Sequence, residues 1–325
     1  MMMNDIQHTI EAMCRQEQNG YKTADYLHQE QPVQEQPWKR QRGPLHAVSS
    51  NNNIVNIPIE LVDIDQECRS KMAAWCFQVV DFCKFSRETV SIAMNLLDRF
   101  LLTRAAAPAK ANRKTYQLAA MTCLYTAVKI HEPEAMDPKL VSNLSRGTYS
   151  AAEVEAMELQ LLQALSWRVN PPTALAFVRH LLALIQQTYS LESYTVDTIY
   201  DLTKFQTELS CSEYDFLSVP PSTVAYCALR NALESVGIDD FALSQMSHIM
   251  AQAIGIQNNS NHNESNVETV QQWLYAAIVN ESSPSRNALS HTHRMACGAV
   301  ASSKQQHPTL ARQTSHEVSP RSVSV

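Results

Sequence analysis

The chain has 325 residues, of which 45% are hydrophobic and 18% charged, so it can bury the cores of two ordinary domains and still carry polar tails. Its formal net charge of −6 argues against a protein whose main work is to neutralise nucleic-acid phosphates. None of the eight cysteines forms a C-x-x-C pair, so neither a zinc ribbon nor a dithiol redox site is indicated.

The N-terminus lacks the apolar core of a signal peptide, and no apolar run reaches the length of a membrane span. We therefore expect a soluble protein of the nucleus and cytoplasm. Residues 5–28 are predicted to form one amphipathic helix, with Ile6, Ile10 and Met13 on its apolar face. The polar stretch 29–56 holds too little apolar surface to fold alone and is predicted to be a flexible insertion.

The next hundred residues show strong helical periodicity. Apolar residues recur every three or four positions from Cys68 to Cys83, and a second helix follows from about Ser86 to Leu101. A third helix, about 113–131, is apolar on nearly all sides and belongs in the centre of a bundle. A short fourth helix starts at Asp137-Pro138, and Ser150 with Glu153 forms a capping box that opens a fifth.

After Asn170-Pro171-Pro172 the pattern of helices begins again, which suggests a structural duplication. We predict an all-α protein with two tandem five-helix domains, at 59–170 and 171–280. Residues 1–58 would supply the N-terminal helix and the insertion, and 281–325 a disordered tail. The helices expected in the second domain lie at about 173–188, 192–210, 221–235, 239–254 and 264–280.

One segment resembles a known family signature. The run from Cys68 to Leu101 opens with an Arg, places an aromatic six residues later and closes with an apolar–Asp–Arg–apolar cluster, as the cyclin box does. The matching residues are Arg69, Trp75 and Asp98, while Cys76 stands where a larger aliphatic residue is usual.

Two downstream runs, LAAMTCLYTAVKIHE at 118–132 and EVEAMELQLLQALSWRVNPPTALAFV at 153–178, also look like cyclin helices. The resemblance covers roughly 59–280 and implies two tandem five-helix cyclin folds. The runs AAWCFQVVDF, AMNLLDRFL and MELQLLQALSWRV look closest to G1-type, D-like cyclins.

The resemblance implies a non-catalytic regulatory subunit that binds and activates a cyclin-dependent serine/threonine kinase to control the cell cycle, at the G1/S transition for the D-like type. By resemblance, Lys129 and Glu158 grip the kinase, although periodicity alone would make them ordinary solvated charges. Arg69 and Asp98 match an internal ion pair between the first two helices, since a buried Arg needs a partner.

A candidate docking patch for substrates or inhibitors with an Arg-x-Leu element matches Cys68, Met72 and Trp75, although Lys71 and Ala73 depart from its pattern. Trp75 is expected in the core on either interpretation. The run Leu209-Ser-Cys-Ser-Glu213 spells the L-x-C-x-E pocket-protein motif of D-type cyclins. It lies in a predicted helix, so we interpret it as coincidental, because docking as a strand needs a free backbone.

Four short motifs lie in the polar segments, and all are of low specificity. They are the basic cluster Lys39-Arg40-Gln41-Arg42, the proline-directed sites Ser283-Pro284 and Ser319-Pro320, and the degradation-type spacing Arg286 to Leu289.

No phosphate loop, nucleophile elbow or metal-ligand spacing is present in the sequence, so we expect no catalytic site, metal or cofactor. The main alternative is a transcription factor with tandem cyclin folds that binds DNA and polymerase. That class normally carries a zinc ribbon and a basic face. A helical-repeat scaffold is disfavoured because the third helix, apolar on nearly all sides, is typical of the centre of a globular bundle and not of one layer in a stack of repeats.

Overall fold

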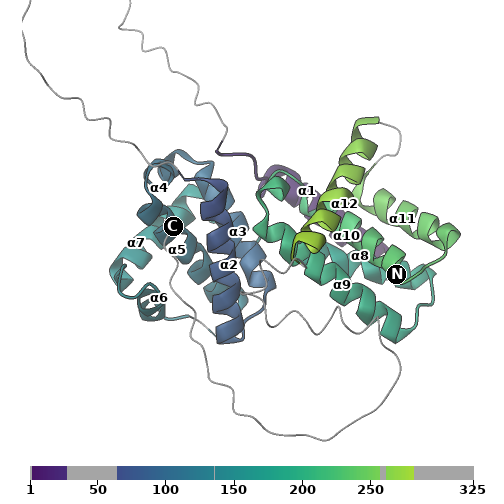
Figure 1. Ribbon diagram of the computed structural model, residues 1–325, viewed down its shortest axis with the longest axis horizontal. Coiled ribbons are helices and arrows are strands. Elements are labelled where there is room, and N and C mark those ends of the chain that lie inside the picture. The colour runs from purple at the N-terminus through teal and green to yellow at the C-terminus, as the bar shows by residue number, and fades with distance from the viewer. Residues whose placement is uncertain (1, 28–63, 135, 257–260, 282–325) are drawn as a thin grey trace, which may run out of the picture.

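The computed structural model describes residues 2–27, 64–134, 136–256 and 261–281, and these residues contain helices and irregular segments but no strand. The helices form two bundles that lie side by side, α2 to α7 in one and α8 to α12 in the other, with α1 against the second (Figure 1). The all-α prediction with two tandem helical domains is therefore confirmed.

The first bundle is built around α5, whose residues from Ala119 to Val128 are all buried. The predicted capping box of Ser150 and Glu153 is present at the start of α7. Helix α6 begins at Pro138, and the Asp137 side chain accepts a hydrogen bond from the Lys139 backbone N–H. The helices are α2 (Gln66–Cys83), α3 (Glu88–Leu101), α4 (Ala107–Ala111), α5 (Arg113–His131), α6 (Pro138–Leu144) and α7 (Ala151–Ala164).

The second bundle surrounds α10, which is buried almost throughout from Ser222 to Leu233. Pro221 occupies the first turn of that helix, where a missing N–H costs nothing. The helices are α8 (Ala174–Thr188), α9 (Ser193–Ser212), α10 (Pro221–Ser235), α11 (Asp240–Ile254) and α12 (Asn261–Glu281).

Two local predictions were wrong. The N-terminal helix α1 spans Met2–Asn19 and does not continue to residue 28. Beyond Gly20 the chain runs irregularly, because its apolar residues, including the buried Tyr26, pack on the bundles and not on a helix face. The first bundle also contains the short helix α4, which makes six α-helices where five were expected.

Several sequence predictions lie outside the described residues. These are the insertion 29–56, its basic cluster at 39–42, and the tail with the motifs at Ser283, Arg286 and Ser319. Among the helices of the described ranges, none is long and apolar enough to cross a membrane.

Candidate functional site

Lys129 and Glu158 are brought together from two helices of the first bundle. The Lys129 Nζ lies 3.1 Å from Oε2 and 3.3 Å from Oε1 of Glu158, across α5 and α7. Lys129 sits in the last turn of α5, where a cation also interacts favourably with the helix dipole. The two charges therefore face each other across adjacent helices.

The expectation that both charges lie in solvent was wrong for Glu158. Its side chain is 11% exposed, against 49% for that of Lys129. The carboxylate is covered because it also accepts a hydrogen bond, at 3.4 Å, from the fully buried Thr126 on α5. Glu158 is thus fixed in orientation by two donors, and Lys129 is the more exposed member of the pair.

The hydrogen bond from Lys129 to Glu158 raises the pKa of the Lys129 ammonium above its ordinary value. The Nζ also lies 5.5 Å from the centre of the Tyr125 ring, a favourable cation–π position. The ammonium is therefore held in its charged form at neutral pH, ready to donate to acceptors from outside the chain.

Three large apolar side chains are exposed on the two helices that carry this pair or directly after them. Ile130, which follows Lys129 on α5, is 45% exposed, Leu159 on α7 is 52% exposed, and Trp167 after α7 is 64% exposed. Single exposed apolar residues are ordinary, but three of them together with a charge pair on two packed helices mark a candidate interface. We name Lys129, Ile130, Glu158, Leu159 and Trp167 the α5–α7 face.

Trp167 is held outward by an unusual turn. Ser166 and Trp167 have φ values of 53° and 60°, in the left-handed region that costs a non-glycine residue about 1–2 kcal/mol. A contact of 3.3 Å between His131 Nε2 and the Val169 carbonyl keeps this turn beside the end of α5. Sequence reasoning missed Trp167, because it follows a helix end and no periodicity predicts its direction.

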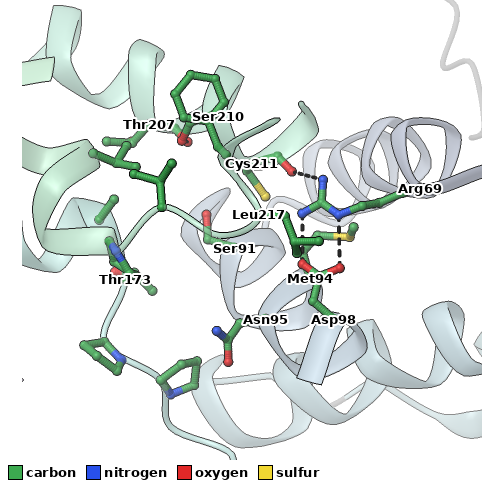
Figure 2. Close-up of a pocket in the computed structure, with 17 residues that line it drawn as sticks. Arg69, Ser91, Met94, Asn95, Asp98, Thr173, Thr207, Ser210, Cys211 and Leu217 are labelled. Carbon is green, nitrogen blue, oxygen red and sulfur yellow. Dashed lines mark hydrogen bonds and ion pairs between the residues drawn. The ribbon is translucent and has the colours of Figure 1, made fainter. Parts of the chain in front are cut away.

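Arg69 and Asp98 form a buried ion pair between α2 and α3. Arg69 Nη2 lies 2.9 Å from Asp98 Oδ2 and Nε lies 3.0 Å from Oδ1. Burial alone would lower the pKa of Arg69, but the Asp98 carboxylate raises it overall. Arg69 also donates, at 3.0 Å, to the Cys211 carbonyl of the second bundle, as Figure 2 shows. The pair therefore has a structural role, because it joins α2 to α3 and links both to the end of α9.

The candidate docking patch is not a surface in this structure. Cys68 and Trp75 are each 2% exposed and Met72 is fully buried, so all three belong to the core. The open side of α2 carries instead a Lys71–Glu67 ion pair of 3.2 Å. Trp75 lies in the core as expected, and Cys68 and Met72 join it there because helix α2 turns this stripe toward the bundle.

The L-x-C-x-E run occupies the last turn of α9 and the residue after it. Its Cys211 and Ser212 carbonyls accept hydrogen bonds from Arg69 and Ser70. The backbone is therefore helical and engaged, and it cannot add as a strand to another protein without unfolding.

No group of three metal-ligating side chains occurs among the residues that the structure describes. Burial raises the pKa of the Cys14 thiol to about 12 and that of Cys211 to about 11. Thiols of this kind stay protonated near neutral pH and are poor nucleophiles.

Comparison with known proteins agrees with the geometry. The model of the cyclin N-terminal domain matches residues 47–170, and that of the cyclin C-terminal domain matches residues 172–307. The chain belongs to the cyclin family. The Lys129–Glu158 pair and Trp167 lie in the part that matches the N-terminal cyclin domain.

Similar cyclins are found in plants. Over 173 residues this cyclin is 30% identical to Cyclin-A2-2 of Arabidopsis thaliana, covering 53% of the chain and 38% of the relative. Over 175 residues it is 29% identical to G2/mitotic-specific cyclin-2 of Medicago sativa, covering 53% and 49%. The chain thus spans less than half the length of these relatives.

A solved structure supports the fold. The viral cyclin from herpesvirus saimiri superposes with a TM-score of 0.51 at 16% identity, covering 66% of this chain and 87% of the viral one. At this identity the likeness concerns the arrangement of helices.

Proposed function

We propose that this cyclin is the regulatory subunit of a cyclin-dependent serine/threonine kinase, and that it binds the kinase through the α5–α7 face. The observation that carries the proposal is a pre-aligned charge pair between α5 and α7, combined with three exposed apolar side chains on or directly after the same two helices. Protein interfaces obtain affinity from desolvated aromatic and aliphatic anchors, while charge-assisted hydrogen bonds fix register.

The chemistry suits kinase activation. An active kinase needs the glutamate of its mobile helix to pair with the lysine that holds the ATP phosphates. A rigid partner face can hold that helix inward. Lys129 has donors to offer to backbone carbonyls, and Glu158 offers oxygens to N–H groups. Ile130, Leu159 and Trp167 would supply the apolar contact, with Trp167 as the anchor.

The phase of the cell cycle is a finer part of the proposal. The runs quoted above favour a G1-type, D-like cyclin acting at G1/S, whereas the similar plant cyclins bear A-type and G2/mitotic names. We therefore propose a cell-cycle kinase as the partner without assigning the phase, and we expect the complex in the nucleus and cytoplasm. The transcription-factor alternative is not favoured, since the matching domain models are those of cyclins.

The test is reconstitution with purified cyclin-dependent kinases of both the G1 and the mitotic classes. Binding is measured by calorimetry and activation by phosphorylation of a histone substrate. We expect one class to bind and to gain activity, and Trp167→Ala to abolish most of that gain. Failure to bind any such kinase, or retention on a DNA duplex instead, would refute the proposal.

A further inference from the structure

The N-terminal helix α1 is fastened to the second bundle by a buried carboxylate. Glu17 is 5% exposed, and its two oxygens accept hydrogen bonds from Ser222, one from the backbone N–H at 3.0 Å and one from the hydroxyl at 2.5 Å. Ser222 lies in the first turn of α10, whose free N–H groups favour an anion. Ile10 and Met13 of α1 complete the attachment within the apolar core of that bundle.

The chain then crosses to the first bundle. We call Gly20–Leu27, the irregular segment after α1, the strap. The Tyr21 carbonyl accepts a hydrogen bond from Asn95 at 3.2 Å, and the Arg99 guanidinium lies 4.7 Å from the centre of the Tyr21 ring. Thr23 donates back to the Leu217 carbonyl of the second bundle at 2.5 Å. The strap therefore holds both bundles within eight residues.

Tyr26 is the most buried side chain of the strap, at 4% exposed. Its hydroxyl donates to Asp98 Oδ1 at 3.1 Å, so it shares this carboxylate with Arg69. Its ring meets the ring of Tyr214 edge-on, with centroids 5.8 Å apart. The Tyr214 hydroxyl in turn donates to Asp25 of the strap at 2.7 Å.

The Asp98 carboxylate links the strap to the end of α9. Arg69, held by Asp98, donates to the Cys211 carbonyl at 3.0 Å, and Ser70 donates to the Ser212 carbonyl at 3.1 Å. Carbonyls in the last turn of a helix have no donor within that helix, so these two bonds cap α9 from the other bundle. One continuous set of contacts thus runs from Tyr26 through Asp98 and Arg69 to α9.

Polar contacts and apolar packing both fix this junction. A cavity of about 100 Å³ lies between the bundles, lined by Met94 and Asp98 of the first bundle and by Thr173, Cys211 and Leu217 of the second or its approach (Figure 2). The pocket is open to solvent, and beside it Tyr214 and Leu217, which follow α9, pack in the apolar core of the first bundle. The polar contacts around Asp98 add to this apolar packing and fix the relative position of the bundles more specifically.

We propose that the strap couples the two cyclin folds, and that this coupling depends on the hydrogen bond from the Tyr26 hydroxyl to Asp98. While Tyr26 engages Asp98, Arg69 is held in place to cap α9. Loss of the Tyr26 hydroxyl removes one of the donors that fix Asp98, so the Asp98–Arg69 pair is held less firmly. The strap and the end of α9 then open locally more often, while each bundle stays folded. This coupling is a property of the free chain, so it can be tested without a kinase and does not depend on the proposed function.

The test is hydrogen–deuterium exchange of the full chain, comparing Tyr26→Phe with the parent. This change removes one hydroxyl and keeps the buried ring. The matched control is Tyr194→Phe, because the Tyr194 side chain on α9 is 78% exposed. We expect amides of 20–27 and of 205–217 to exchange about tenfold faster in Tyr26→Phe, the scale of a lost hydrogen bond to a charged group. Amides of α5 and α10, and every segment of Tyr194→Phe, should keep the parent rates.

Two results would overturn the proposal. Faster exchange confined to 20–27 would show that the strap only lies over the junction and does not couple the bundles. A uniform rise in exchange along the chain, as in a variant that folds poorly, would show that Tyr26 supports global stability and not the coupling of the two folds.

Discussion

Removing the Lys129–Glu158 pair should separate binding from folding. In the double variant Lys129→Ala with Glu158→Ala, the chain loses an ion pair whose lysine is half exposed, which is worth about 0.2–1 kcal/mol. The buried Thr126 hydroxyl also loses its acceptor, and leaving a buried donor without a partner costs about 1–3 kcal/mol. We therefore expect the free energy of unfolding to fall by about 1–4 kcal/mol in all, and the chain to remain folded.

Kinase affinity should fall further. Groups on the kinase that meet these charges would be buried without partners, and such losses are about 2–5 kcal/mol. At 1.4 kcal/mol per factor of ten, this is a fall in affinity of about 30-fold to several thousand-fold. The effect on binding is larger because water solvates the α5–α7 face in the free chain and is excluded from it in the complex.

The assay pairs urea unfolding with calorimetric titration of the kinase. The control is Arg230→Ala with Glu234→Ala, which removes an ion pair of 3.3 Å on α10 whose side chains are 37% and 34% exposed. The control should bind the kinase as the parent does. Equal loss of affinity in both variants, or a loss of folding stability above about 4 kcal/mol in the test variant, would refute the assignment of the pair to the interface.

Three further predictions follow from the same structure. Arg69→Ala should lower the free energy of unfolding by about 3–5 kcal/mol in urea, because the buried Asp98 is left unpaired, whereas a change below about 1 kcal/mol would contradict its structural role. Trp167→Ala should change unfolding by less than about 0.5 kcal/mol yet weaken kinase binding by at least about 2 kcal/mol, and the reverse order would place Trp167 in the core. Burial raises the pKa of Glu17, so its ionised form is disfavoured in the fold, and that penalty disappears as pH falls through the folded and then the unfolded pKa. The stability of Glu17→Gln relative to the parent should therefore fall from pH 7 toward pH 4 in paired urea titrations, because the parent loses this penalty and the amide does not titrate; a pH-independent difference would refute this.

Much of the fold could be predicted from the sequence, because helix formation is governed by local patterns. Apolar residues at three- and four-residue spacing indicated the helices of both bundles, and the Ser150–Glu153 capping box marked the start of α7. The apolar surround of α5 placed it at a bundle centre. Even the expected pairing of Arg69 with Asp98 had a simple reason, since a charge on a buried stripe needs a partner.

The tertiary structure decided which side chains are open to a partner. Glu158 is covered because Thr126 and Lys129 approach it from another helix, and Trp167 is exposed because a left-handed turn aims it outward. The strap is irregular because its two tyrosines bind Asn95 and Asp98 on α3, which competes with continuing helix α1. Periodicity and capping motifs reflect interactions between residues that are close together in the sequence. Exposure and orientation depend on groups that only packing brings together, so they could not be read from periodicity.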